Sequence, residues 1–202
     1  MRITKNRYYS LTSKAFSPEN LDHLSTQILS SCYLGYSQLS DSFAGTKGFS
    51  IVFTRAGISQ VENNFPAFGC YLRTALKSNC NAFYLNPLIL EAGGRVSPHI
   101  DCSISEYSQC LTIANIVSVL YILVPSDLEG GELILTKRDE CIGKIVPQIN
   151  TLLYFKGNLA HSVNEVKSKQ IRISLVCEQY SLSNEILKLI PNFKVISGNK
   201  IY

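Results

Sequence analysis

The chain has 202 residues, of which 46% are apolar and 17% are charged, and its formal net charge is +4. This length suits one domain with a sizeable core, and a charged share below the usual ~25% indicates that much of the chain is buried. The basic residues are scattered, and the longest basic runs are Lys137-Arg138 and Lys167-Ser168-Lys169, which argues against a nucleic-acid-binding surface.

Signals for a membrane, for secretion and for disulfides are missing from the sequence. No stretch approaches the ~18 consecutive apolar residues of a membrane span, and MRITKNRYYSLTSKAF lacks the apolar core of a signal peptide. The seven cysteines are odd in number and form no C-x-x-C pair, which argues against a disulfide framework or a zinc knuckle. We therefore expect a cytoplasmic protein with reduced, mostly structural thiols, and the sequence leaves its oligomeric state open.

The first 80 residues are expected to form a layer of helices and loops. SPENLDHLSTQILSSC predicts a helix with Ser17 as its N-cap and Pro18 at its first position. His23 falls on the exposed side of this helix. An apolar stripe at helical spacing marks the other side: Leu21, Leu24 and Ile28.

A second helix is expected in AFGCYLRTALKS, and the segment before it is expected to be a loop. SDSFAGTKGFSIVFTRAG is rich in Gly and Ser and predicts a loop with a short strand. The apolar face of the second helix is formed by Phe68, Tyr71, Leu72, Ala75 and Leu76.

From Ala82 onward, short runs rich in β-branched and aromatic residues alternate with turn residues. The runs are AFYLNPLILEA, VSPHI, IVSVLYILV, GELILT, GKIVP, TLLYF, SVNEV and QIRISLVCEQY. Strands at such regular spacing are typical of an antiparallel sandwich or barrel. SLSNEILKLI predicts one more helix, capped near Ser183. We therefore predict a mainly β fold with flanking helices packed on the outside.

Two of the three histidines are candidates for a metal site. Side chains alternate along a strand, so His99 and Asp101 in RVSPHIDCS point the same way and can reach one cation. Taken alone, H-x-D is more typical of a histidine hydrogen-bonded to a nearby carboxylate than of a metal site. His161 lies 60 residues after Asp101 and is the third member of the candidate site. Two imidazoles and one carboxylate are the ligand set of the facial triad in Fe(II) oxygenases. Zinc accepts the same ligands, so the triad leaves the metal open.

Arg172 lies eleven positions after the distal histidine, and alternation places Ser174 on the same face of its strand. An arginine that points into a β-sandwich needs an anion. A guanidinium binds a carboxylate in bidentate fashion, and a serine hydroxyl adds a third hydrogen bond. Ile171, Ile173 and Leu175 favour an inward Arg172 by forming the opposite face, although the pattern alone allows either face to be the buried one.

These motifs together give a family resemblance. The sequence resembles the Fe(II)- and 2-oxoglutarate-dependent dioxygenases, and within them the prolyl-4-hydroxylase-like branch, from about Leu88 to Tyr180. The matching segments are LEAGGRVSPHID, SVLYILV, EGGELIL, NTLLYFKGNLAHSVNEV and QIRISLVCEQY. The resemblance implies a double-stranded β-helix, or jelly roll. It also implies a single domain over 1–202, with the helical and loop layer in 1–80, the jelly-roll core in 81–180 and a C-terminal helix and tail in 181–202.

The resemblance also assigns roles to residues. It implies that the metal ligands are His99, Asp101 and His161. It implies that 2-oxoglutarate is bound by Arg172, Ser174 and Tyr121. Gly130 and Gly131 match the paired glycines before a strand of the family. Many members carry a tyrosine nine or ten residues before the first iron-binding histidine, where this chain has Leu90 and Ile89, so one cosubstrate contact of the family is missing or replaced.

The implied activity is that of a hydroxylase. Its cofactors are Fe(II), 2-oxoglutarate and dioxygen, with ascorbate as an optional addition. Asp101 argues against a halogenase, because related halogenases have a small residue there. The expected substrate is an amino acid, a peptide-like metabolite or a prolyl-type residue. Candidate substrate contacts are Arg95, Ser103, Tyr107 and the loop from Asp41 to Gly48.

Three alternative functions are weighed against this one. Nucleic-acid demethylases of the same superfamily usually carry a second arginine six residues after the first, and this chain has Glu178 there. A zinc hydrolase with the same triad leaves Arg172 without a role. A non-enzymatic β-sandwich binding module makes the triad a coincidence. We therefore expect no nucleic acid and no membrane among the partners.

Overall fold

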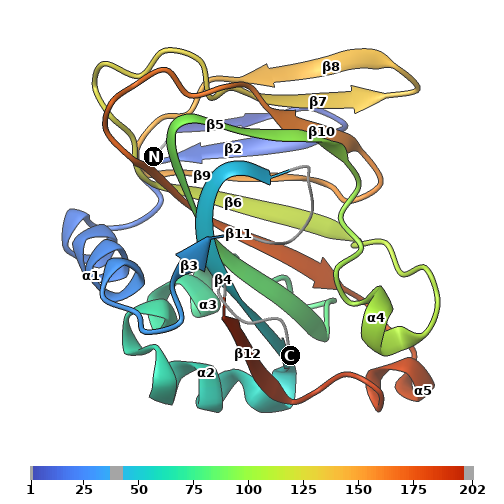
Figure 1. Ribbon diagram of the computed structural model, residues 1–202. Helices are drawn as coiled ribbons and strands as arrows, with labels where there is room; N and C mark the ends of the chain where they lie inside the picture. Colours follow the sequence, from blue (N-terminus) through green and yellow to red (C-terminus); the bar gives the residue numbers. More distant parts are fainter. Residues whose placement is uncertain (1, 37–42, 198–202) are drawn as a thin grey trace.

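A curled antiparallel sheet dominates the computed structural model, which describes residues 2–36 and 43–197 (Figure 1). Its strands are β1 (Arg2–Lys5), β2 (Tyr9–Ser13), β3 (Gly35–Tyr36), β4 (Phe43–Thr54), β5 (Ala82–His99), β6 (Ile116–Leu123), β7 (Leu133–Lys137), β8 (Glu140–Ile145), β9 (Thr151–Lys156), β10 (Ala160–Val163), β11 (Arg172–Tyr180) and β12 (Phe193–Ser197). The helices are α1 (Pro18–Leu29), α2 (Ile58–Asn64), α3 (Gly69–Ala75), α4 (Ser105–Ser108) and α5 (Asn184–Leu187), with 3-10 turns at η1 (Arg55–Gly57) and η2 (Pro66–Phe68).

The long strand β5 connects the two halves of the curl. The strand order is β1-β2-β9-β6-β11-β5-β10-β7-β8, and β4 lies on β5 and also pairs with β3 and β12. On one side β5 pairs with β4 from Ala82 to Val96, whereas on the other its first half pairs with β11 and its last residues pair with β10. One strand therefore belongs to both sheet sections. The predicted mainly β, jelly-roll class with helices outside is confirmed.

The two faces of the central strands have different neighbours. Rows of paired residues alternate between the faces, as they must in a pleated sheet. The row Tyr121–Ser174–Leu88 across β6, β11 and β5 faces the inside of the curl. Leu120 and Leu175 point to the other side, where they join the core formed with the helices. Both faces of β11 are therefore buried.

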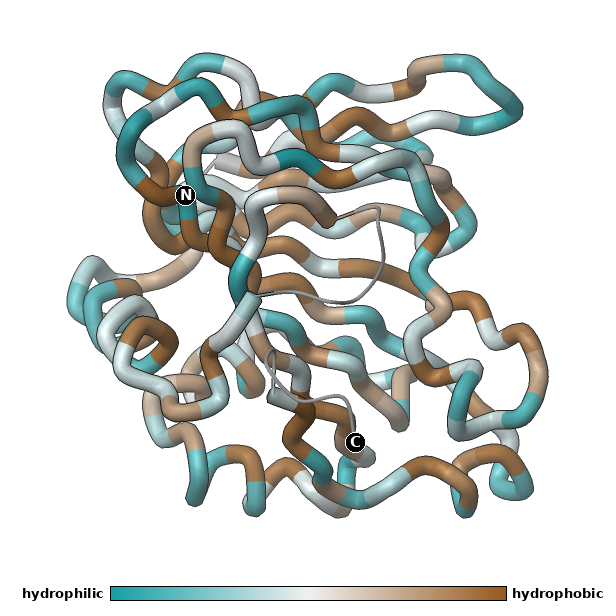
Figure 2. The backbone as a smooth tube through the Cα atoms, in the orientation of Figure 1, coloured by the Kyte–Doolittle hydropathy of each residue, from teal (hydrophilic) through white to brown (hydrophobic). Residues whose placement is uncertain are grey.

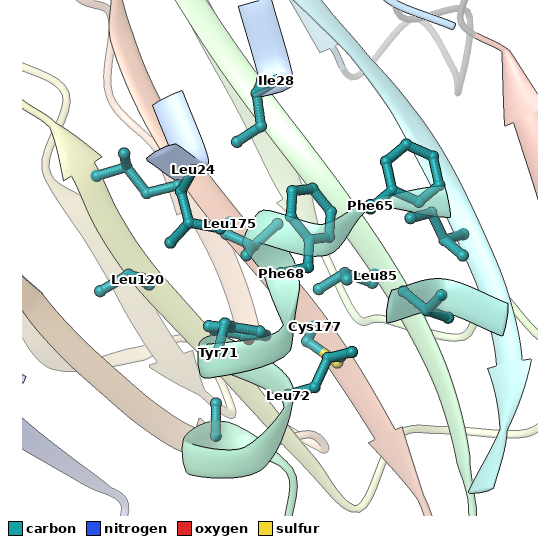
Figure 3. Close-up of a cluster of buried hydrophobic side chains, with 14 of the residues drawn as sticks. Leu24, Ile28, Phe65, Phe68, Tyr71, Leu72, Leu85, Leu120, Leu175 and Cys177 are labelled. Atoms are coloured by element: carbon teal, nitrogen blue, oxygen red, sulfur yellow. The ribbon is translucent and has the colours of Figure 1, made fainter. Parts of the chain in front are cut away.

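Figure 3 shows this outer core, in which helical side chains pack onto the sheet. Leu24 and Ile28 of α1, Phe68 of η2 and Tyr71 of α3 are all completely buried. The Tyr71 hydroxyl lies 3.0 Å from Oγ of Ser118 on β6, which satisfies both polar groups inside the core. The helices thus fix one face of the sheet and leave the other face to form the cavity described below.

The predicted first helix is confirmed as α1. It begins at Pro18, and Oγ of Ser17 accepts a hydrogen bond from the backbone N–H of Asn20 at 3.2 Å. His23 is exposed, as expected. The predicted apolar stripe is buried. The second predicted helix is found as η2 and α3, and the last as α5, where Oγ of Ser183 accepts from the N–H of Ile186.

Residues 40–57 were expected to form a loop with a short strand. The extent of the loop was wrong, because residues 43–54 form the twelve-residue strand β4. Its glycines mark irregular pairing and not a loop. Gly45 has a φ of +61° at a shift in the register with β5. At Gly48 a Cβ atom would lie 2.4 Å from the carbonyl oxygen of Pro87 on β5. Glycine in a strand often marks such a bulge or close backbone approach.

The description of the chain ends also needs correction. Residues 1–80 were expected to hold helices and loops, but β1, β2, β3 and β4 lie there as well. Residues 181–202 were expected to hold a helix and a tail, but β12 follows α5 and pairs with β4. Apart from β4, these strands are short, carry many polar residues and lie at or near the sheet edges, so their apolar alternation is weak.

Hydropathy along the chain follows this architecture. Figure 2 shows hydrophobic residues along the central strands and hydrophilic ones at the far tip of the β7–β8 hairpin. The turn at that tip contains Arg138 and Asp139, which are exposed and have positive φ angles. Within residues 2–36 and 43–197, no helix is long and apolar enough to cross a membrane.

Candidate active site

Two neighbouring strands and one turn bring His99, Asp101 and His161 together. His99 is the last residue of β5, and His161 lies opposite it in the register of β10. Asp101 follows in an irregular turn after the strand has ended, so strand alternation is not what aligns it with His99. The three side chains each offer a ligand atom, and these atoms lie within 4.8 Å of one another. The group predicted from sequence is thus assembled.

Backbone carbonyls orient both imidazole rings. Nδ1 of His99 lies 2.9 Å from the carbonyl oxygen of Ser97, and Nδ1 of His161 lies 3.4 Å from that of Leu159. With Nδ1 donating to the backbone, Nε2 keeps its lone pair. Nε2 of His99 is 3.3 Å from Oδ1 of Asp101, and Nε2 of His161 is 3.5 Å from Oδ2. Both lone pairs therefore point to the region of the carboxylate, as metal binding requires.

The electrostatics of the cluster suit a cation. Burial raises the pKa of Asp101, but the charge of His161 and the hydrogen bond with His99 outweigh it and hold this pKa below its usual value. Burial lowers the pKa of His161. Burial also acts to lower the pKa of His99, but the hydrogen bond and the charge of Asp101 outweigh it, so that the pKa of His99 is raised. Oδ2 of Asp101 is buried and accepts no hydrogen bond. A divalent cation between the three groups would satisfy this oxygen.

A cavity of about 230 Å³ adjoins the cluster. It is enclosed by β4, β5, β6, β7, β10, β11 and the segment after His99. Its charged lining consists of the His/Asp/His cluster, Arg172 and Glu178. Its other lining residues are Phe43, Tyr84, Asn86, Leu88, Val96, Ile100, Cys102, Ser103, Val119, Tyr121, Leu133, Val163 and Val176.

Arg172 is a buried cation without an anionic partner. It is 2% exposed, and among the ion pairs of the described residues none includes it. Nη1 donates to the carbonyl oxygen of Gly131 at 2.5 Å, and Nε and Nη2 lie 3.3 Å from Oγ of Ser174. All of these acceptors are neutral. The guanidinium is therefore held in place, while its charge is left for something that enters the cavity.

Tyr121 lies beside this arginine. The guanidinium carbon is 5.2 Å from the centre of the Tyr121 ring. Burial raises the pKa of Tyr121, and the charge of Arg172 partly offsets this. The Tyr121 hydroxyl is buried and has no hydrogen-bond partner. Leu90 lies opposite Arg172 in the register and offers no polar group, and Ile89 faces the helices.

The residues expected to contact the substrate are scattered. Arg95 is exposed and does not line the cavity. Tyr107 lies on α4 with a buried, unpartnered hydroxyl, also outside the cavity lining. Ser103 lines the cavity. Of the segment from Asp41 to Gly48, Asp41 and Ser42 lie outside the described residues, and Phe43 lines the cavity. The substrate roles of these residues stay predictions.

Sequence reasoning did not assign a role to Glu178, although a signal was available. Counting every second residue from Arg172 along β11 leads through Ser174 and Val176 to Glu178, which is buried and lines the cavity. Burial and the charge of Asp101 raise the pKa of Glu178 to about 8. Asn86 and Tyr84 on β5 line the cavity beside it and were also missed.

Comparison with known proteins agrees with this geometry. The family model of the 2OG-Fe(II) oxygenase superfamily matches residues 83–177, a range that includes the histidine and aspartate cluster and Arg172. No curated protein sequence matches the chain significantly.

Several solved structures have a similar fold. A prolyl-4-hydroxylase from Pseudomonas putida is 15% identical with a TM-score of 0.58, covering 88% of this chain and 95% of that one. A 2OG-Fe(II) oxygenase family oxidoreductase from Burkholderia pseudomallei is 14% identical with a TM-score of 0.57, covering 87% and 86%. A prolyl hydroxylase from Trichoplax adhaerens, in complex with a hypoxia inducible factor peptide fragment, is 14% identical with a TM-score of 0.56, covering 91% and 87%. The predicted resemblance is confirmed, and for the prolyl hydroxylases it is a likeness of fold.

Proposed function

We propose that the chain is a 2OG-Fe(II) oxygenase, an enzyme that uses Fe(II), 2-oxoglutarate and dioxygen, and we assign it a substrate and a role for each site residue. The enzyme hydroxylates a C–H bond of an amino acid, a peptide-like metabolite or a prolyl-type residue. His99, Asp101 and His161 are the iron ligands. When bound, the iron supplies the oxidation, in which 2-oxoglutarate and dioxygen become succinate and carbon dioxide and the substrate gains one oxygen atom.

The clustering of the three ligand atoms within 4.8 Å carries the proposal. Two neutral imidazoles and one carboxylate on one side of a metal leave its other positions open, which is the arrangement of Fe(II) oxygenases. The backbone carbonyls that accept from both Nδ1 atoms fix the tautomers in advance. Their role in this chain is to hold Nε2 of His99 and of His161 toward the metal.

Arg172 binds the far carboxylate of 2-oxoglutarate in this proposal. A buried guanidinium with only neutral partners needs an anion. The dicarboxylate supplies one, and the unpartnered hydroxyl of Tyr121 and the Ser174 hydroxyl lie beside the guanidinium to complete its binding. Apolar side chains such as Leu88, which lines the cavity, keep water away from this contact.

The same residues weigh against the alternatives. A zinc hydrolase needs the triad but gives Arg172 no anion to bind. A nucleic-acid demethylase must accommodate phosphates, and the buried Glu178 adds negative charge inside the cavity. The prolyl hydroxylases with a similar fold, one of them bound to a peptide, favour an amino-acid or peptide substrate. The free state of all seven cysteines supports a cytoplasmic location, where thiols stay reduced.

One screen tests the substrate class. Purified protein with Fe(II) and 2-oxoglutarate is given amino acids, proline-containing peptides and, for comparison, methylated oligonucleotides, and products are examined by mass spectrometry. We expect a gain of one oxygen atom on at least one of these compounds, together with succinate formation. Oxidation confined to methylated nucleic acids, or hydrolysis without succinate, would contradict the proposal.

A further inference from the structure

We propose that the cavity contains a second charge-recognition subsite, centred on Glu178, which binds a basic nitrogen of the substrate. The inference rests on the proposed function, because it names the chemical class of the substrate for the same site. Arg172 takes the anionic cosubstrate at one end of the cavity, and Glu178 takes a cationic group of the substrate elsewhere in it.

The position of Glu178 follows from the strand that carries Arg172. Both side chains lie on the inner face of β11, six residues apart, which corresponds to roughly 20 Å of strand at ~3.3 Å per residue. Glu178 is 4% exposed, and both residues line the cavity that also adjoins the metal cluster. One strand therefore presents a buried cation and a buried carboxyl group, at separate positions, to the same small space.

The hydrogen bonds of Glu178 favour the ionised carboxylate. Oε2 accepts from the backbone N–H of Ser103 at 3.0 Å and from the Tyr180 hydroxyl, and Oε1 accepts from the Ser103 hydroxyl at 2.5 Å. Three donors to one carboxyl group favour its charged form, but burial and the charge of Asp101 outweigh them and raise its pKa to about 8. A cation placed beside the carboxyl group would therefore be what holds it ionised at neutral pH. All three donors are neutral, so they orient the group without balancing its charge.

No lysine or arginine in the part of the chain that the structure describes pairs with this carboxyl group. Among the ion pairs of the described residues, none includes Glu178. A buried charge without a counter-charge is costly, and proteins usually pair it. In the proposed holoenzyme the metal balances the negative charge of Asp101. Glu178 is then a buried acidic group that still lacks a cation. Arg172 stands in the same situation with the opposite sign, and there the missing partner is the cosubstrate.

Tyr84 adds a second element suited to a cation. It lies opposite Glu178 in the register of β11 and β5, it is 5% exposed, and it lines the cavity. An aromatic ring next to a carboxylate attracts ammonium and guanidinium groups through its negative face. The carboxylate and the ring together form a site that binds a positively charged nitrogen more strongly than a neutral group.

The size of the cavity limits what can carry this nitrogen. Its volume of about 230 Å³ is below the ~300–1,000 Å³ of ordinary small-molecule sites, and 2-oxoglutarate shares it. The group that enters is therefore about as large as one side chain. An aliphatic chain that ends in an ammonium or guanidinium group fits, either in a free amino acid or in a peptide.

The test compares substrates that differ only in this charge. The parent enzyme with Fe(II) and 2-oxoglutarate receives free lysine or norleucine, and in a second arm the same two side chains in compounds blocked at both backbone ends. We expect at least one lysine compound to stimulate succinate formation at a concentration about thirtyfold or more below its norleucine counterpart, the size expected for a buried charge pair. The arm that responds distinguishes a free amino acid from a peptide substrate.

Two variants test whether Glu178 causes the preference. In Glu178→Gln the ratio between lysine and norleucine compounds should fall to about one, whereas Glu140→Gln, a change at an exposed residue of β8 that does not line the cavity, should keep the parent ratio. An unchanged ratio in Glu178→Gln would overturn the subsite. If that variant does not fold, the comparison in the parent still decides, since equal or absent responses to both compounds contradict the subsite.

Failure of the underlying function would look different. The parent enzyme is also assayed for 2-oxoglutarate binding and for succinate formation without substrate. If both are absent, the proposed function itself is removed, and the subsite with it. If both are present and cationic compounds have no advantage, only the subsite is wrong.

Discussion

Replacing Arg172 with methionine should separate cosubstrate binding from fold stability. The change removes the guanidinium but keeps a chain of similar length in a position that is 2% exposed. The variant loses a buried, unpaired charge, and replacing such charges by apolar groups is often neutral or stabilising. It also leaves the Gly131 carbonyl without its donor, which costs about 1–3 kcal/mol. We therefore expect only a modest change in the melting temperature of the protein without ligand.

The effect of 2-oxoglutarate on stability should change much more. At a hundredfold excess over Kd, a ligand stabilises the folded state by about 2.7 kcal/mol. At about 2–4 °C per kcal/mol for a domain of this size, Tm should rise by roughly 5–11 °C in the parent. Loss of a buried charge contact weakens binding about thirtyfold or more. The same ligand concentration then stabilises the variant by at most about 0.9 kcal/mol, which corresponds to a rise in Tm of roughly 2–3 °C.

The assay is thermal unfolding of the anaerobic Fe(II) protein over a titration of 2-oxoglutarate. Arg172→Lys serves as the graded comparison, because it restores the charge but not the forked geometry, and it should lie between parent and Arg172→Met. A full ligand-induced shift in Arg172→Met would refute the carboxylate contact, whereas loss of folding in the absence of ligand would show that Arg172 is mainly structural.

Three further outcomes are expected. His161→Ala should remove most of the bound Fe(II), because one of the three proposed ligands is lost, and metal analysis of the purified variant checks this. Leu24→Ala should lower the free energy of unfolding by about 2–5 kcal/mol in urea denaturation, since Leu24 is completely buried. The control Leu29→Ala, at a position that is 45% exposed, should change this free energy by less than about 0.5 kcal/mol. Burial raises the pKa of Cys177 well above its ordinary value, so at neutral pH iodoacetamide should modify the exposed Cys110 and spare Cys177 in the folded protein. Equal labelling of both thiols would contradict the buried position.

The metal cluster was predictable because its members carry distinctive chemistry at fixed spacing. His99, Asp101 and His161 could be grouped without knowing the exact backbone, although the reason given for the first two was incomplete, since Asp101 lies beyond the end of β5. The inward direction of Arg172 could not be decided from alternation alone. Both faces of β11 are buried, one under helices and one in the cavity, so the strand has no solvent-exposed face to compare.

The long-range pairings were not predictable. The eighteen residues of β5 read as two short runs, because the Gly93-Gly94-Arg95 interruption falls inside one strand that changes partners. The glycines of β4 suggested a loop, whereas they permit its close approach to β5. Such features depend on which strand lies alongside, and this information is not contained in the local sequence.

Succinate formation from 2-oxoglutarate tests the assignment most directly. The purified protein is incubated with 2-oxoglutarate and dioxygen, with and without Fe(II), beside the Asp101→Ala variant. We expect succinate in the parent only when Fe(II) is present, and little or none in the variant at any iron concentration. Succinate formation that needs no iron, or that survives unchanged in Asp101→Ala, would contradict a reaction at the metal held by His99, Asp101 and His161.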